Sequence, residues 1–137
     1  MTPQQDQTGA TILIVDNHPP TLAAVRSLLS AAFPACRISA AKSAERALEL
    51  CANHAPHVVV MDIVLPGIDG IEATRRIKSL LPDTAVVMLS SHDIAIYRDA
   101  AAAAGAGSFV TKKEAFRDLV PAVNSLLPAA FRVPAGS

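Results

Sequence analysis

Two carboxylates, an amide, a hydroxyl and an ammonium group each stand at the end of a short apolar run in this 137-residue chain. They belong to Asp16, Asn17, Asp62, Ser90 and Lys112. Carboxylate and amide oxygens suit a hard divalent cation such as Mg²⁺, whereas a hydroxyl and an ammonium suit the oxygens of a phosphoryl group. If the fold brings these residues together, the sequence predicts a site for both.

Each of these residues has a simpler explanation when it is taken alone. Asp16 or Asn17 could cap a helix that starts at the two prolines that follow, since prolines suit a first helical turn. Asp62 could lie in a turn, Ser90 in a solvated loop, and Lys112 on an open surface. Their joint occurrence at the ends of four different apolar runs favours one shared site instead.

The apolar runs themselves predict the sheet that would gather these residues. They are rich in β-branched side chains and alternate with helix-like segments, which is typical of an α/β fold whose parallel sheet is covered by helices on both faces. Ligands of such sheets bind beyond the carboxyl ends of the strands. The expected strands cover residues 12–15, 37–40, 58–61, 85–89 and 108–111.

The segments between these runs carry helix signals. Asp69 and Gly70 form a turn that precedes a helix, and Gly105 is a C-cap after a run of alanines. For the last helix, Pro121 leaves two alternatives: the helix starts near Asp118 as its N-cap, or it kinks at the proline. An earlier helix has one apolar face at the spacing i, i+3, i+4, i+7, formed by Ala44, Ala47, Leu48 and Cys51.

Composition excludes several classes of protein. Apolar residues make up 51% and charged residues 18% of the chain, which excludes a disordered protein. The 12 basic residues balance the 12 acidic ones and there is no Trp, so we expect no direct binding of nucleic acid. The longest uncharged stretch, residues 119–131, contains two prolines and is too short for a membrane span. The N-terminus lacks the pattern of a secretion signal, and we expect a cytoplasmic protein with reduced thiols.

Four motifs resemble those of response regulator receiver domains, the switch domains of bacterial two-component signalling, and this match covers residues 11–127. They read ILIVDNHP, VVVMDIVLPGIDGIEATRRIK, VVMLSSHD and GAGSFVTKK. Within the family, the chain is most similar to receivers that precede a helix-turn-helix DNA-binding output. The resemblance implies a flavodoxin-like α/β fold: a five-stranded parallel sheet in the strand order 2-1-3-4-5, with five helices.

The same resemblance divides the chain into three segments. We expect a flexible N-terminal tail over residues 1–10, a receiver domain over residues 11–127, and a C-terminal tail or linker stub over residues 128–137. A homodimer through the last helices is compatible with the sequence.

The resemblance implies that Asp62 is a phosphoacceptor, which takes a phosphoryl group from a phosphohistidine on a sensor histidine kinase or a phosphotransfer protein. Asp16 would help to hold Mg²⁺ through water, and the backbone carbonyl of Val64 would be another ligand. Asn17 departs from the family, which usually has a second acid there as a direct metal ligand. A unit charge at about 5 Å is worth roughly 3 kcal/mol at an effective dielectric constant of about 20, so we expect weaker Mg²⁺ binding.

Three further residues would respond to the phosphoryl group. By the resemblance, the Ser90 hydroxyl bonds to it, Lys112 pairs with one of its oxygens, and Phe109 occupies an aromatic switch position whose ring rotates inward. The added charge would shift a protein-interaction surface between two arrangements. We therefore expect a signalling switch with at most weak autophosphatase activity, and not a metabolic enzyme.

Two other kinds of function stay open at this point. Asn17 favours an interaction module that keeps the fold but is not controlled by phosphorylation, whereas Asp62, Ser90 and Lys112 favour the switch. An aspartyl phosphatase on a similar sheet would need a second acid where Val64 stands, and a cofactor binder would need a phosphate loop. Neither GxxxxGK[ST] nor GxGxxG occurs in the chain.

Overall fold

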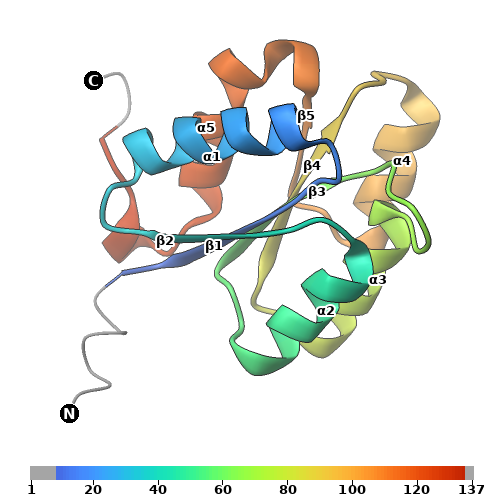
Figure 1. The fold of residues 1–137 in the computed structure, drawn as a ribbon, viewed down its shortest axis with the longest axis horizontal. Coiled ribbons are helices and arrows are strands. Elements are labelled where there is room, and N and C mark those ends of the chain that lie inside the picture. The colour runs from blue at the N-terminus through green and yellow to red at the C-terminus, as the bar shows by residue number, and fades with distance from the viewer. Residues whose placement is uncertain (1–8, 135–137) are drawn as a thin grey trace.

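The computed structural model describes residues 9–134, which form alternating strands and helices (Figure 1). The strands are β1 (Thr11–Val15), β2 (Arg37–Ala41), β3 (Val58–Asp62), β4 (Ala85–Ser90) and β5 (Ser108–Thr111). The α-helices are α1 (Pro19–Ala32), α2 (Ala44–Asn53), α3 (Gly70–Leu80), α4 (Ala95–Ala104) and α5 (Ala115–Leu126), and two 3-10 turns are η2 (Lys112–Glu114) and η3 (Ala129–Phe131).

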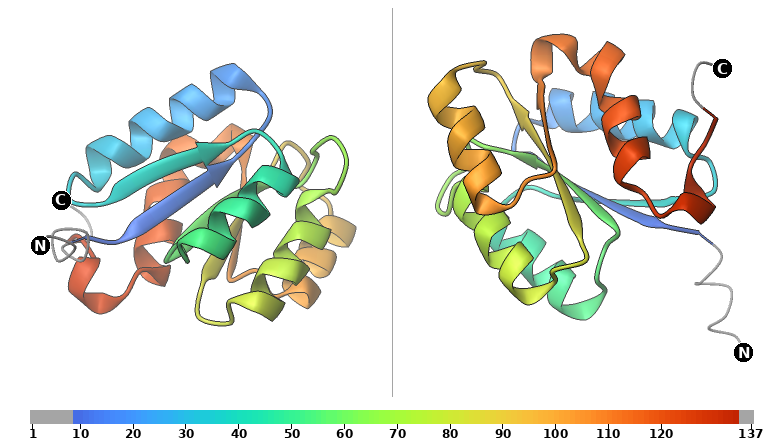
Figure 2. Two further views of the ribbon diagram at one scale, coloured as in Figure 1. Left: turned by 60° about the horizontal axis from the view of Figure 1, so that its bottom comes forward. Right: turned by 180° about the vertical axis from the view of Figure 1, so that it is seen from behind.

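All strand pairs are parallel, and the sheet has the order β2-β1-β3-β4-β5. This confirms the α/β fold, the flavodoxin-like strand order and the five helices predicted above. Helices α1 and α5 cover one face of the sheet, and α2, α3 and α4 cover the other (Figure 2). The reversal of strand order between β1 and β3 is the point at which such sheets bind ligands.

Two apolar cores form because the central strands are buried on both faces. Every residue of β3 is buried, as a near-continuous apolar strand in the middle of a parallel sheet should be. Side chains of β3 alternate between the two cores: Val59 and Met61 pack beneath α2 and α3, while Val58 and Val60 pack beneath α1 and α5. The cores hold the central strand rigidly from both sides, and Asp62 stands at its last position.

The helix ends follow their sequence signals in part. Asp69 is the N-cap of α3 and its side chain accepts the backbone N–H of Glu72, and Gly105 ends α4 in the left-handed conformation at φ 106°. The N-cap of α1 is His18, with prolines at the first two helical positions, and not Asp16 or Asn17. The Asp16 side chain instead accepts the backbone N–H of His18 at 2.8 Å.

Of the two alternatives for the last helix, the start near Asp118 is wrong. Helix α5 begins at Ala115, directly after η2, and Pro121 lies inside it. The missing N–H of Pro121 removes one bond of the helical ladder. The buried side chains of Leu119 and Val123 hold the helix against the sheet on either side of this gap.

The segment after α5 makes tertiary contacts where the structure describes it, over residues 128–134. Asn124 forms two hydrogen bonds of 2.8 Å with the backbone of Val133, one as donor and one as acceptor. The Arg132 guanidinium donates to the carbonyl of Leu127 at 2.8 Å, at the end of α5. Phe131 packs edge-on against the His57 ring. These tertiary contacts were not readable from local sequence.

The other expected segment limits stay predictions. Most of the N-terminal tail proposed for residues 1–10 lies outside the described residues, and the limits of the domain at residues 11 and 127 are not tested by the fold alone. Within residues 9–134, no helix is both long and apolar enough to cross a membrane.

Candidate functional site

The parallel sheet brings the predicted polar residues to one edge. Asp62 ends β3 and Ser90 ends β4, while Asp16 follows β1 and Lys112 follows β5. All four stand at the carboxyl end of their strands, which is the ligand-binding edge of such a sheet. The strand register places Asp62 beside Leu89, and Ser90 beside Thr111.

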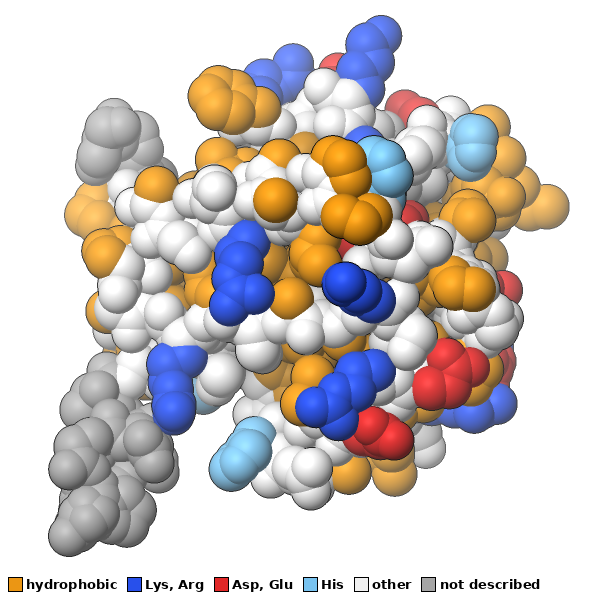
Figure 3. All heavy atoms as spheres, in the orientation of Figure 1, with side chains coloured by type: hydrophobic (Ala, Val, Ile, Leu, Met, Phe, Trp, Pro, Cys, Tyr) orange, Lys and Arg blue, Asp and Glu red, His pale blue; other side chains and the backbone are white. Residues whose placement is uncertain are grey.

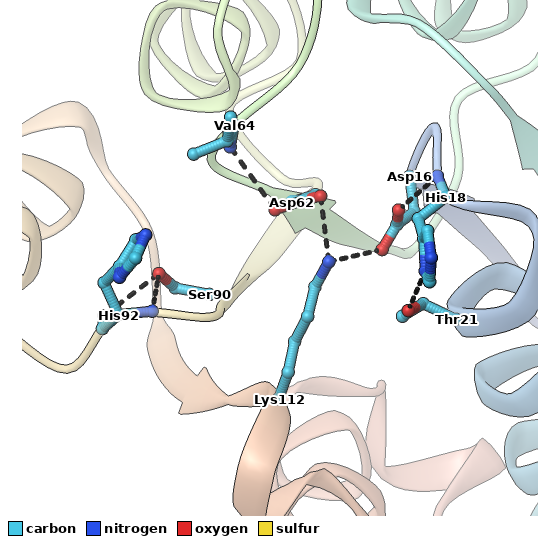
Figure 4. Close-up of polar contacts among 8 residues, drawn as sticks. All are labelled: Asp16, His18, Thr21, Asp62, Val64, Ser90, His92 and Lys112. Carbon is cyan, nitrogen blue, oxygen red and sulfur yellow. Dashed lines mark hydrogen bonds and ion pairs between the residues drawn. The ribbon is translucent and has the colours of Figure 1, made fainter.

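Lys112 links the two carboxylates. Its ammonium nitrogen lies 3.0 Å from Asp62 Oδ2 and 3.1 Å from Asp16 Oδ2 (Figure 4). The side chains of Asp16 and Asp62 are only 2% and 7% exposed, and that of Lys112 is 20% exposed. Two nearly buried negative charges therefore share one positive charge at the end of the central strands.

This arrangement shifts the protonation equilibria of the site. Burial raises the pKa of the Asp62 carboxyl above its ordinary value; the hydrogen bond from Lys112 offsets this in part, and the charge of Asp16 adds to it. Burial would lower the pKa of Lys112, but its close contacts with the two carboxylates outweigh burial and raise the pKa. Lys112 is therefore a cation at neutral pH, poised beside a carboxylate whose charge is only partly compensated.

Backbone groups orient both carboxylates. Asp16 Oδ1 accepts the N–H of His18, and the N–H of Asp16 itself donates to the carbonyl of Ala41 at 3.1 Å. Asp62 Oδ1 accepts the N–H of Val64 at 3.3 Å. The remaining oxygens of the two acids point toward Lys112, as Figure 4 shows. One oxygen of each acid is thus tied to the backbone, and the other faces the site.

The acidic pair fits a divalent cation. Asp16 Oδ2 is buried and accepts no hydrogen bond of good geometry, so its contact with Lys112 is an ion pair that leaves lone-pair capacity for a metal. Hard cations such as Mg²⁺ take carboxylate, carbonyl and water oxygens. Within residues 9–134 no group of three or more His, Cys, Asp and Glu side chains is placed to hold a metal, so backbone and water oxygens would complete the shell. Asn17 follows Asp16 and is exposed.

Ser90 has other hydrogen-bond partners in this structure. Its hydroxyl donates to the carbonyl of His92 and accepts the N–H of the same residue, both at 3.0 Å. Figure 4 shows Ser90 and His92 on the far side of Asp62 from Asp16. The hydroxyl is therefore held by its own loop, and it would have to leave His92 to bond to a group on Asp62.

Phe109, the predicted switch residue, is half-buried on β5. Its ring is covered by the guanidinium of Arg98, whose central carbon lies 4.5 Å from the ring centre. The sequence carried no signal for this contact, because it depends on how α4 packs beside β5.

Two other residues that shape the site were not predicted. A Cβ at Gly70 would lie 2.0 Å from the carbonyl oxygen of Asp62, so α3 can start this close to β3 only with glycine there. The Glu45 carboxylate accepts the N–H of Ile68 at 3.3 Å, which ties the loop after β3 to α2. Asp69-Gly70 read as a turn and helix start, but no local pattern reveals a close approach between distant backbones.

An apolar groove adjoins the site on the α1 and α5 side. It has a volume of about 370 Å³, and Lys112 and Leu89 lie at its sheet end. Pro20, Ala24 and Leu28 of α1 line one wall, and Phe116 of α5, which is 88% exposed, lines the other. In Figure 3 hydrophobic side chains are exposed along the upper part of the molecule, over α1 and the start of α5.

Comparison with known families gives one match over most of the chain. Residues 12–124 match the family model described as "Response regulator receiver domain". The match contains all of the residues that gather at the edge of the sheet.

The curated relatives and solved structures agree with this match. The chain is 37% identical over 126 residues to the transcriptional activator protein ExaE of Pseudomonas putida, covering 91% of this chain and 55% of that protein. A crystal structure of a two-component response regulator of the LuxR family from Aurantimonas sp. aligns with a TM-score of 0.81 at 32% identity, over 93% of this chain and 91% of that one. The BeF3-activated DrrB receiver domain aligns with a TM-score of 0.78 at 29% identity, over 86% and 97% of the two chains. This chain spans between half and three-fifths of the length of the curated relatives it matches.

Proposed function

This chain belongs to the response regulator receiver family, and from that premise we propose that it accepts a phosphoryl group on Asp62 from a phosphohistidine of a sensor kinase or phosphotransfer protein. One observation carries this proposal above the others: the Lys112 ammonium lies between the carboxylates of Asp62 and Asp16. The same geometry would hold a transferred phosphoryl group beside a cation.

In the transfer step, an Asp62 carboxylate oxygen attacks the phosphorus atom. The new O–P bond forms as the P–N bond to the donor imidazole breaks, and the imidazole departs with the electron pair of that bond. Lys112 would exchange part of its ion pair with Asp62 for a phosphoryl oxygen, so that the developing charge meets a fixed cation. Burial of Asp62 keeps water away from its side chain and strengthens these interactions.

A metal ion is part of this proposal. Asp16, Asp62 and the backbone carbonyl of Val64 would hold Mg²⁺, and the cation would offset negative charge on the phosphoryl oxygens. Asn17 offers a neutral oxygen where a second acid would add charge, so the site would bind the cation more weakly.

The signal would leave the site through the loop after β4. A phosphoryl group adds about −1.5 to −2 charge and strong acceptor oxygens. The Ser90 hydroxyl would exchange its bonds with His92 for one of these oxygens, and the loop would move with it. Phe109 would then rotate inward, which changes the surface formed by α4 and β5. The modification shifts a balance between two arrangements of the same elements.

The groove between α1 and α5 supports docking of the phosphate donor. It opens beside Lys112, and its apolar lining with the exposed Phe116 ring suits a helix of another protein. The names of the relatives, which include transcriptional regulators and LuxR-family proteins, support an output in transcription. We propose that the chain is a cytoplasmic signalling component and not a metabolic enzyme, with at most slow hydrolysis of its own aspartyl-phosphate.

The test is chemical phosphorylation with acetyl phosphate and Mg²⁺, followed by intact mass measurement. Wild type should gain one phosphoryl group, and Asp62→Ala should gain none while keeping its circular dichroism spectrum. Asp83→Ala removes an exposed acid in the loop after α3 and should behave as wild type. Modification of Asp62→Ala to the same extent as wild type would refute the assignment of Asp62.

A second candidate is an interaction module that is not controlled by phosphorylation. Asn17 favours it, because the site lacks one acidic metal ligand. If wild type gains no mass from acetyl phosphate and no spectral change from beryllofluoride with Mg²⁺, while it remains folded, this second candidate replaces the first.

A further inference from the structure

The ring of Phe109 is covered by a charged group from a different element. The guanidinium carbon of Arg98, in the first turn of α4, lies 4.5 Å from the centre of the ring on β5. A guanidinium over an aromatic face is attracted by the ring electrons, so this contact favours the ring orientation seen here.

Arg98 is in turn held by the loop that follows β4. Its Nε donates to Asp93 Oδ1 at 2.5 Å, and the two side chains are 46% and 56% exposed. An ion pair this exposed adds little to stability, so stabilising the fold is not a sufficient role for it. Its geometric effect is to direct the guanidinium onto Phe109.

The loop that carries Asp93 starts at the site. Ser90 ends β4, and its hydroxyl makes two hydrogen bonds with the backbone of His92, the residue before Asp93. If Ser90 turns toward a phosphoryl group on Asp62, those two bonds break. Asp93 then loses the position from which it holds Arg98.

The outer side of the Phe109 ring is open apart from Arg98 and small residues. A surface pocket of about 210 Å³ adjoins Phe109, and small residues such as Ala101, Gly107 and Ser108 line it beside Arg98. Phe109 packs against the core on its inner side, and on this outer side the guanidinium of Arg98 covers the ring.

We propose that Arg98 is a positioning residue that couples the loop after β4 to Phe109: paired with Asp93, it retains the ring in the resting orientation and releases it when Ser90 moves. This inference rests on the proposed function, because it concerns how the phosphorylated site would reach the surface. Removing Arg98 should favour the activated arrangement without touching the phosphorylation chemistry.

The test follows the Phe109 ring directly. The chain has four Phe residues, so protein labelled with fluorophenylalanine gives few ¹⁹F resonances, and Phe109→Leu identifies the one that belongs to Phe109. Beryllofluoride with Mg²⁺ is titrated into wild type, Arg98→Gln, Asp93→Asn and the control Arg117→Gln, which removes an exposed arginine of α5.

In Arg98→Gln the Phe109 resonance should already lie closer to its activated position before any addition. The beryllofluoride concentration for half-conversion should fall about two- to fivefold, the scale of one exposed cation–π contact. Asp93→Asn should act in the same direction, and Arg117→Gln should match wild type.

The outcomes separate the two proposals. One outcome is that wild type responds to beryllofluoride, while Arg98→Gln has the same Phe109 resonance and the same midpoint as wild type. This outcome overturns the role of Arg98 and leaves the proposed function intact. No response of any resonance in wild type overturns the proposed function, and the coupling role fails with it.

Discussion

The ammonium group of Lys112 lies 3.0 Å from the carboxylate of Asp62, although 50 residues separate them in the sequence. The contact exists because β3 and β5 lie on either side of β4 and run in the same direction, so that their carboxyl ends meet at one edge. The shared site expected from the strand ends therefore forms at this edge of the sheet.

Removal of the Lys112 charge should destabilise the fold. Lys112→Ala leaves Asp16 and Asp62 nearly buried without their shared cation, which should cost about 1–3 kcal/mol of unfolding free energy after allowance for partial exposure. Urea unfolding at pH 7 measures this cost. The matched control is Lys113→Ala at the neighbouring exposed position, which should stay within about 0.5 kcal/mol of wild type. Equal losses in both variants would contradict the ion pair's contribution.

Restoration of an acid at residue 17 should strengthen metal binding. Asn17→Asp adds a carboxylate next to Asp16, and a unit charge at about 5 Å is worth at most roughly 3 kcal/mol before screening. Calorimetric titration with Mg²⁺ should therefore give at least a severalfold lower Kd. Asn53→Asp, at the exposed end of α2, makes the same chemical change elsewhere and should leave the Kd unchanged. Equal affinities of wild type and Asn17→Asp would sink this prediction.

Neutralising Asp62 should stabilise the protein in a pH-dependent way. Because burial raises the pKa of Asp62 in the folded state, stability that the protonated acid contributes at low pH is lost as the pH rises through that raised pKa. Asp62→Asn, which carries no charge, should avoid this loss and be more stable than wild type at pH 7.5.

Urea midpoints measured between pH 4 and pH 8 test the sign of this effect. The advantage of Asp62→Asn over wild type should shrink as the pH is lowered toward the ordinary carboxyl range. Asp83→Asn, which makes the same chemical change at an exposed acid, is the matched control. If the stability advantage of Asp62→Asn over wild type instead grows toward acid pH, the raised pKa of Asp62 is not its cause.

Gly70→Ala should destabilise the protein although alanine is the better helix former. The added Cβ would lie 2.0 Å from the carbonyl oxygen of Asp62, so the start of α3 or the end of β3 must move, at a cost of roughly 1–3 kcal/mol. Gly107→Ala is a control that should cost less, because the nearest atoms to its Cβ would belong to the Leu126 side chain, at 3.2 Å, and not to the backbone. Thermal unfolding of both variants measures these costs. A Gly70→Ala protein as stable as wild type would contradict the close approach of α3 to the carbonyl of Asp62.

Asn124→Ala should release the segment after α5. The substitution removes both 2.8 Å hydrogen bonds to Val133, each worth about 1 kcal/mol, while the bond from Arg132 to Leu127 remains. Hydrogen exchange of the Val133 amide should become about tenfold faster or more. Ser125→Ala changes the neighbouring exposed residue and should leave the exchange rate of that amide unchanged. Equal protection in Asn124→Ala and wild type would show that these two hydrogen bonds do not hold the segment.

The strands and the site edge could be predicted from local patterns. A run such as 58–61 is apolar throughout because both faces of β3 are covered, and the polar residue that follows must then lie where the strand leaves the core. The strand order came from the resemblance to receiver domains, since local pattern alone does not say which strands are neighbours.

The features that could not be predicted from local sequence depend on contacts between distant segments. Helix α5 begins at Ala115 directly after η2, and its N-cap residue, Glu114, makes no side-chain capping hydrogen bond, so no capping signal marks this start. Residues 128–134 read as a tail because their partners, among them His57 and Asn124, lie elsewhere in the chain. The Arg98 contact with Phe109 was hidden for the same reason.

The packing of Phe131 beside His57 also fixes where the described C-terminal segment lies relative to the site. His57 precedes β3, so the chain after α5 returns to the amino-terminal edge of the sheet, where β1 also enters, and both described ends lie opposite the edge that carries Asp62 (Figure 1). A fluorescent protein or a purification tag joined at residue 9 or residue 134 would therefore start at the opposite end of the sheet from Asp62. A fusion at these positions would therefore leave the edge that carries Asp62 and Lys112 uncovered.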